Sequence, residues 1–172
     1  LNPANIGFLP GKYRASLIHR NQWRGILDKA YTTSSANFDL ELKSPTSIGT
    51  KDKIGIGLSF LNDHIGLIDL NTNVMALGLA YHRFLSKKGN HYLRAGAQFS
   101  LNQRNLNFAN LYFSDQFNGA SAYSFSTLET LPANINSYGN IHLGLLYTAD
   151  WTPYVGINLG LAVHNINTPD IT

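Results

Sequence analysis

Histidine, serine and asparagine are the side chains of this sequence that could perform chemistry, because together they can form the nucleophile and base of a hydrolase. The sequence has six histidines, and none of them forms a His-x-x-x-His pair of the kind that binds zinc. It has no cysteine, which excludes disulfides and thiolate metal sites. No local motif marks one serine as a nucleophile. We therefore predict no catalytic, cofactor or metal site, and keep a barrel-embedded lipid hydrolase as an alternative without assigned residues.

Asn62, Asp63 and His64 are consecutive, and Asp69 follows closely, so this stretch offers ligands for a cation. A calcium site needs several regularly spaced oxygens around a glycine turn, and that spacing is missing here. Asn and Asp are also favoured in turns, where their side chains accept backbone hydrogen bonds. We predict that Asn62 and Asp63 form the turn at the end of a strand.

Gly55 and Gly57 resemble a nucleotide-binding glycine pattern, but no helix follows them to hold a phosphate. Glycines inside a strand relieve crowding or permit curvature. We predict that these two glycines do so on an interior face.

His19, Arg20 and Trp23 lie together near the expected end of a strand and could form a cation–aromatic or anion site. The alternative, which we favour, is an arginine lining a polar interior and a tryptophan anchored at a membrane interface.

Asp115, Gln116 and Phe117 lie in a long irregular region. Loops on a rigid scaffold often carry function, so these residues could contact a partner. Packing against a barrel rim explains them equally well.

The elements that position these residues are segments in which apolar and polar residues alternate. Leu93 to Leu101 is one such segment, with Arg94, Gly96, Gln98 and Ser100 at the alternate positions. A period of two indicates strands with one apolar and one polar face. Charged residues make up only 13% of the chain, and the polar faces are rich in Gly, Ser and Asn. These features are typical of a transmembrane β-barrel, apolar towards lipid and polar towards its lumen.

Composition argues against a helical membrane protein and against a nucleic-acid-binding protein. The mean hydropathy is −0.13, and no run of about 18 apolar residues could form a membrane helix. The net charge of +3 is too small and too scattered to predict nucleic-acid binding.

The alternation predicts about seven strands, at residues 12–23, 31–42, 53–61, 65–84, 91–103, 137–148 and 154–164. The fourth segment is long enough that we expect either an interruption at Asn71 to Asn73 or a projection beyond the bilayer. Residues 104–136 form the one long loop, which is typical of an external loop. Residues 150–153 should form a tight turn. Bacterial barrels have even strand numbers, so we expect residues 1–172 to be a single partial barrel domain, truncated at both ends and incomplete without further strands.

Several short motifs, in this order, resemble the PorP/SprF family of outer-membrane proteins. They are Asn2-Pro3-Ala4, Tyr13-Arg14-Ala15-Ser16, His19-Arg20-Asn21-Gln22-Trp23, Ile54-Gly55-Ile56-Gly57-Leu58, Asn62-Asp63, Gly66-Leu67, Leu79-Ala80-Tyr81-His82, Gly96 and Asp115-Gln116-Phe117. The resemblance implies a non-enzymatic barrel in a bacterial outer membrane, associated with the type IX secretion system. It also implies partners: outer-membrane lipid, secretion-machinery proteins, and a large secreted or surface cargo such as a gliding adhesin.

The same resemblance singles out nine positions as structural or partner-contact residues: Arg20, Trp23, Asn62, Asp63, Tyr81, His82, Asp115, Gln116 and Phe117. It implies no cofactor and no catalytic residue.

Two further alternatives remain open. Arg14, Arg20 and Arg94 on the polar face could line a porin-like passive diffusion channel. A soluble β-barrel ligand-binding protein would instead expose charged faces, and the apolar faces here are too continuous for that class.

Overall fold

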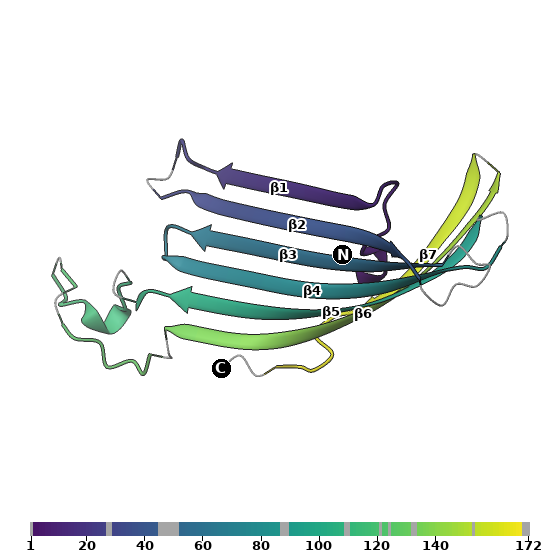
Figure 1. Ribbon diagram of the computed structural model, residues 1–172. Helices are drawn as coiled ribbons and strands as arrows, with labels where there is room; N and C mark the ends of the chain where they lie inside the picture. Colours follow the sequence, from purple (N-terminus) through teal and green to yellow (C-terminus); the bar gives the residue numbers. More distant parts are fainter. Residues whose placement is uncertain are drawn as a thin grey trace.

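The computed structural model describes residues 2–26, 29–44, 52–86, 90–108, 111–120, 122–123, 125–131, 134–152 and 154–169. Seven strands form one sheet, in the order of the sequence (Figure 1). They are β1 (Tyr13–Gln22), β2 (Tyr31–Lys43), β3 (Lys53–Ile65), β4 (Leu70–Phe84), β5 (His91–Leu106), β6 (Ile135–Thr152) and β7 (Val155–Val163). Each strand pairs antiparallel with the next, so β1 and β7 are the two edges. The prediction of about seven strands is confirmed, and the antiparallel order is that of an up-and-down barrel wall.

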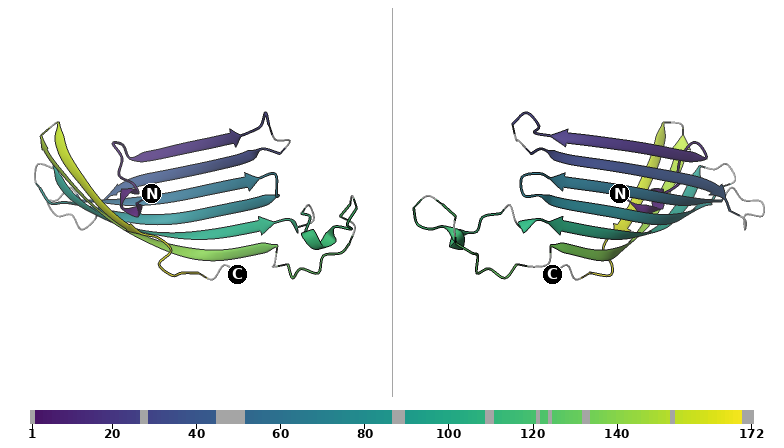
Figure 2. Two further views of the ribbon diagram at one scale, coloured as in Figure 1. Left: turned by 180° about the vertical axis from the view of Figure 1, so that it is seen from behind. Right: turned by 60° about the vertical axis from the view of Figure 1, so that its left-hand side comes forward.

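The sheet is curled into a half-barrel, with β6 and β7 rising at one side (Figures 1 and 2). The alternation explains its two faces. Side chains such as Leu58, Leu77 and Leu143 stand exposed on the convex face. Their neighbours in sequence, including Gly57, Gly78 and Gly144, are buried on the concave face. No helix among the described residues is long and apolar enough to cross a membrane.

Strand register gives the apolar convex face a sharp border. One polar row crosses six strands: His19, Ser34, Asn62, Asn73, Gln103 and Ser137. The next row on the same face contains Leu17, Ala36, Phe60, Met75, Leu101 and Gly139. We call the apolar rows that begin there the apolar belt. Because every paired strand changes from polar to apolar at the same row, the border belongs to the sheet as a whole.

The prediction of a turn at Asn62 and Asp63 was wrong. Strand β3 continues to Ile65, and the turn lies at residues 66–69. Asn71 to Asn73 do not interrupt the next strand either, since they pair with β3 and β5. The polar residues misled the prediction because they lie where β3 and β4 extend beyond the apolar belt, and there the rows Asn62–Asn73 and Asp63–Thr72 are polar on opposite faces.

The long loop is shorter than residues 104–136, because β5 extends to Leu106 and β6 begins at Ile135. It projects beyond the ends of these strands rather than over the concave face (Figures 1 and 2). Trp151 and Thr152 belong to β6, not to a turn, and the pairing of β6 with β7 shifts register between Asp150 and Thr152. Pro153 lies outside the described residues.

Candidate functional site

The candidate site is the concave face, where residues 2–9 lie across the strands (Figure 2). We call these residues the N-terminal segment. It contains one 3-10 turn, η1 (Pro3–Asn5), which packs against β4, β5 and β6. Pro3, Ala4 and Leu9 are buried. The sequence singled out only Asn2-Pro3-Ala4 of this segment, as one of the motifs that resemble the family.

Asn2 begins the turn and attaches it to two strands. Its Oδ1 accepts a hydrogen bond from the backbone N–H of Ala4 at 2.9 Å, which is the usual role of an N-cap asparagine. Its Nδ2 donates to the carbonyl oxygens of Leu145 and Leu161, at 3.0 and 3.1 Å. One amide side chain therefore starts the turn and holds it against β6 and β7.

Below the segment lies a row of small residues that strand register brings together. The row consists of Gly55, Ala80, Gly96, Gly144 and Ala162, one from each of β3 to β7. We call it the small-residue row. A Cβ atom at position 96 would lie 2.5 Å from the carbonyl carbon of Pro3 and 2.7 Å from the nitrogen of Ala4. A Cβ at position 144 would lie 2.9 Å from Cδ of Pro3. The turn can approach the sheet only because these side chains are absent.

The second half of the segment rests on glycines in the same way. A Cβ at Gly55 would lie 2.7 Å from the carbonyl carbon of Ile6, and one at Gly57 would lie 2.8 Å from Cγ2 of Ile6. Gly7 has a φ of 67°, a backbone conformation that glycine adopts without a steric penalty. The prediction that Gly55 and Gly57 relieve crowding on an interior face therefore acquires a specific cause, the backbone and side chain of Ile6.

Arg94 and His82 fasten the segment from the neighbouring register row. Arg94 is 4% exposed and donates to Oδ1 of Asn5 at 2.8 Å and to Oγ1 of Thr148 at 2.9 Å. Its guanidinium lies 4.0 Å from the ring centroid of Phe8, which makes a cation–π contact. His82 is fully buried, and its Nε2 bonds the carbonyl oxygen of Ile6 at 2.9 Å.

The ring of Phe8 completes an aromatic cluster. It stacks on His82 and on Tyr92, with centroid separations of 5.6 and 5.3 Å. Beside the segment an open hollow of about 800 Å³ remains, lined by apolar and polar side chains that include the ion pair of Arg14 with Asp39. The segment therefore occupies part of the concave face and leaves part of it open.

A serine and two histidines meet on the same face. Ser100 Oγ lies 3.1 Å from Nε2 of His142, and Nδ1 of His142 lies 3.2 Å from Nδ1 of His164. The backbone N–H of Asn165 also donates to Nδ1 of His142, at 3.3 Å. With Nδ1 accepting, the proton of a neutral imidazole is on Nε2 and points at the serine. In this tautomer His142 cannot accept the serine proton, as a catalytic base must.

Among the described residues, no group of three or more His, Asp or Glu side chains is placed to hold a metal ion.

His19, Arg20 and Trp23 do not form one site. His19 and Arg20 are neighbours in β1 and point to opposite faces, and His19 Nδ1 lies 2.9 Å from Oγ of Ser34. Trp23 follows the strand with a φ of 60° and packs edge-on against Tyr31, at 5.0 Å between ring centroids.

Asn62 and Asp63 also point to opposite faces. Asn62 lies in the polar row and donates to Oδ1 of Asn71 and of Asn73, at 2.7 and 2.8 Å. Asp63 accepts from the hydroxyl of Thr33 at 2.5 Å. Both side chains therefore join strands of the sheet.

Tyr81 and His82, neighbours in β4, contact different elements. The hydroxyl of Tyr81 donates to Asp52 at 2.8 Å, whereas His82 contacts the N-terminal segment. Of the nine positions singled out by resemblance, His82 is the one that these contacts place against this segment.

Asp115 and Gln116 hold the long loop together, whereas Phe117 is exposed. Asp115 and Gln116 lie in the 3-10 turn η3 (Ser114–Gln116). Asp115 accepts from the hydroxyl of Thr127 at 3.0 Å and from the backbone N–H of Leu128 at 2.6 Å. Gln116 Oε1 accepts from the N–H of Phe113 at 2.9 Å. The first two side chains are thus used inside the loop.

Phe117 belongs to an exposed aromatic group at the same loop. Its ring lies 5.4 Å from that of Tyr123, which in turn lies 5.2 Å from Tyr112. These three rings are between 44% and 75% exposed. Phe117 is therefore the residue of the Asp115–Phe117 motif whose exposed ring, beside Tyr112 and Tyr123, is available to a partner.

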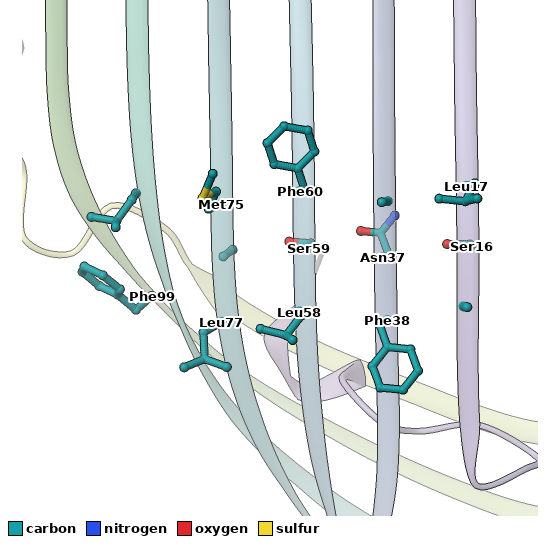
Figure 3. Close-up of a pocket in the computed structure, with 14 residues that line it drawn as sticks. Ser16, Leu17, Asn37, Phe38, Leu58, Ser59, Phe60, Met75, Leu77 and Phe99 are labelled. Carbon is teal, nitrogen blue, oxygen red and sulfur yellow. The ribbon is translucent and has the colours of Figure 1, made fainter.

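The convex face has a shallow apolar hollow over β1 to β5. Figure 3 shows Leu58, Leu77 and Phe99 standing on this face, while Ser59 lies behind them. It is part of the apolar belt and carries no convergent polar groups, so we do not interpret it as a ligand site.

Sequence reasoning missed Asn2, Asn5, Phe8 and Arg94 as members of one site. Asn2 and Leu161 are 159 positions apart, so no local spacing reveals their contact. The available signal was the glycines, which marked the places where the segment approaches the strands.

Comparison with known proteins adds one finding. A family model described as type IX secretion system membrane protein PorP/SprF matches residues 1–172, the full length of the chain. No match was found among curated proteins, and none among solved structures.

Proposed function

The chain belongs to the PorP/SprF family of type IX secretion system membrane proteins, and we propose that it is a non-enzymatic outer-membrane barrel that docks secreted cargo. In this role the barrel supports the secretion or surface attachment of large proteins such as gliding adhesins. Family membership itself implies a membrane location and contact with the secretion machinery. The outer membrane and the cargo are the finer parts of the proposal.

The main support for the membrane assignment is the apolar belt with its aligned polar border. On β5 the belt runs from Leu93 to Leu101, which is about 27 Å at about 3.4 Å per residue. A transmembrane β-strand is about 9–11 residues long and tilted, so the nine residues from Leu93 to Leu101 match the length needed to cross a bilayer. A soluble protein has no reason to expose an apolar surface of this extent, since most monomers keep such patches small.

We further propose that residues 1–172 are one partial barrel domain. The edges of the sheet, β1 and β7, carry backbone groups that a closed barrel pairs with other strands. In lipid such groups have no water to bond, so closure is required. Further strands of the full-length protein supply it in this proposal.

Two features favour docking over passive diffusion. The N-terminal segment occupies part of the concave face, and Arg94 is tied to Asn5 rather than free to attract anions. The long loop, residues 107–134, extends beyond the strand ends (Figure 1). Its Tyr112, Phe117 and Tyr123 are exposed. Exposed aromatic side chains are typical anchors of protein interfaces. We assign cargo contact to this loop, with Phe117 as its motif residue.

The non-enzymatic part of the proposal is supported by the arrangement at Ser100. The serine is 3% exposed, and Nδ1 of the histidine beside it accepts from the backbone N–H of Asn165, which favours the tautomer that donates to the serine. A lipid hydrolase of the barrel type would need the opposite tautomer and an accessible hydroxyl.

The first test is made on the full-length protein in cell envelopes. We expect it in the outer-membrane fraction, with a gel mobility that changes when the sample is boiled, because a closed barrel resists detergent until heated. A protein that fractionates as soluble and shows no mobility change would refute the membrane proposal.

The second test replaces residues 109–132 with a short Gly-Ser linker in the full-length protein, which keeps the pairing of β5 with β6. We expect cargo display at the cell surface to be lost while the mobility change on boiling remains. The matched control replaces residues 87–89, in the β4–β5 connection at the other end of these strands, and should keep display. Display that survives loss of the long loop would overturn its assignment to cargo.

The alternative function, a porin-like channel, is favoured by the open hollow beside Arg14 and Asp39. Conductance in planar bilayers separates the two. Sustained ion conductance by the purified full-length barrel would favour the channel over the docking barrel.

A further inference from the structure

The N-terminal segment contacts the sheet as a ligand contacts a protein. All six strand pairings are made without it, since residues 2–9 contribute no rung to any of the described ladders. Its attachments are side-chain hydrogen bonds, one carbonyl bond and ring contacts, made by Asn2, Asn5, Ile6 and Phe8. The sheet therefore does not need the segment in order to form its hydrogen bonds.

The sheet, in contrast, is shaped for the segment. Glycine destabilises a strand relative to alanine, because its unfolded chain loses more conformational freedom on folding. Five glycines of the concave face lie where a Cβ would overlap the segment: Gly55, Gly57, Gly78, Gly96 and Gly144. These strands thus give up local stability to leave a groove that matches the segment's backbone at Gly55 and Gly96 and the side chains of Asn2, Pro3 and Ile6 at the other three glycines.

We propose that this groove is a peptide-binding site and that residues 2–9 are its resident ligand. The ligand class is a short peptide with an Asn-Pro turn followed by an aliphatic residue, a glycine and an aromatic residue. The proposal goes beyond the docking function and relies only on its barrel fold.

Each part of the peptide has its own recognition element. The side-chain amide of Asn2 donates hydrogen bonds to the carbonyl oxygens of Leu145 and Leu161, which can pair only with a hydrogen-bond donor. The turn packs on Gly96, where any side chain would overlap the backbone of Pro3 and Ala4.

The side chains of Ile6 and Phe8 are contacted by residues on either side of the small-residue row. The side chain of Ile6 covers Gly57 and Gly78. The ring of Phe8 enters the cluster of His82, Tyr92 and Arg94, where cation–π and stacking contacts select an aromatic side chain.

The test uses the full-length protein without residues 2–9, folded in detergent, and a fluorescent synthetic peptide of residues 2–11. Fluorescence anisotropy should show saturable binding to the deleted protein and at least tenfold weaker binding to the intact protein, whose groove is occupied. The control peptide carries Asn2→Asp, which keeps the cap oxygen and removes the donor, and should bind at least tenfold more weakly. A deleted protein that shows the mobility change on boiling but does not bind the peptide overturns the proposal.

A second variant covers the case in which the deletion prevents folding. A specific-protease site is inserted at Gly11, which is exposed and joins the segment to β1. The protein is cut only after it has folded. We expect the cut segment to stay bound and to exchange with excess labelled peptide. Absence of exchange or labelling after complete cutting refutes the ligand assignment, while loss of the mobility change in the uncut protein refutes the proposed barrel instead.

Discussion

Gly96→Ala tests the fit between the N-terminal segment and the sheet most directly. Gly96 lies in β5 under the 3-10 turn, and an added Cβ would be 2.5 Å from the carbonyl carbon of Pro3 and 2.7 Å from the nitrogen of Ala4. Carbon atoms normally approach to about 3.5–4.0 Å, so the overlap is about 1 Å. The atoms in the way are backbone atoms, which cannot rotate aside.

The expected magnitude follows from two opposing effects. Overpacking of this kind costs about 1–3 kcal/mol. Replacing a strand glycine recovers about 0.5–1 kcal/mol through the unfolded state. In the intact protein the first effect is larger, so Gly96→Ala should lower the free energy of unfolding by about 0.5–2 kcal/mol. In the protein that lacks residues 2–9 only the second effect remains, and the same substitution should stabilise.

The assay is a double-mutant cycle on the full-length protein in detergent. Unfolding in denaturant is followed by the gel mobility of unheated samples, in the intact and the deleted background. The coupling between Gly96→Ala and the deletion should be about 1–3 kcal/mol. Gly139→Ala is the matched control, because this β6 glycine faces the exposed ring of Phe99 on the convex side. The reasoning fails if Gly96→Ala has the same effect in both backgrounds, or if Gly139→Ala shows equal coupling.

The remaining predictions concern four other parts of the chain. Phe8→Ala in the labelled peptide should weaken its binding to the deleted protein about tenfold, since stacking and cation–π contacts are together worth about 1–2 kcal/mol; unchanged affinity would contradict the aromatic cluster. Leu77→Lys, inside the apolar belt, should destabilise the lipid-inserted protein by about 2–4 kcal/mol, whereas Asn73→Lys in the polar row should cost about 0–1 kcal/mol; equal costs in vesicle unfolding would place the membrane elsewhere. Asp115→Ala should raise the rate of limited proteolysis within the long loop several-fold, because its carboxylate holds the backbone of Leu128; an unchanged cleavage rate argues against that restraint. Ser100→Ala should leave cargo display and lipid turnover unchanged, and any lost hydrolysis would revive the enzyme alternative.

The sequence predicts those parts of the fold that depend on residues close together in the chain, and it predicts less well those that depend on distant strands. Alternation with a period of two is a local property, so Leu93 to Leu101 predicted a strand and its apolar face before any partner strand was known. Strand ends were predicted less well. Asn62 and Asp63 have the residue types of a turn, yet pairing with β2 and β4 keeps them in β3, because hydrogen bonds to two neighbouring strands outweigh a local preference.

Single residues of the site also show that the sequence predicts local features but not contacts with distant parts of the chain. The sequence indicated that Gly55 and Gly57 relieve crowding, but it could not name Ile6 as the cause. Arg94 was predicted to face inward and does, but its partners Asn5 and Thr148 lie on distant parts of the chain. Ser100 and His142 are 42 positions apart, and their contact depends on the register of β5 with β6.

The sequence by itself thus determined the strands, their two faces and the scarcity of charge that accompanies them, because each of these is set by neighbours within a few residues. Only the tertiary structure decided the small-residue row, since Gly55, Ala80, Gly96, Gly144 and Ala162 become one groove through register alone. A shift of one residue in any ladder would turn that strand's glycine or alanine away from the concave face. Tertiary structure also decided that residues 2–9 occupy the groove, because Asn2 finds its carbonyl partners only after β6 and β7 have paired.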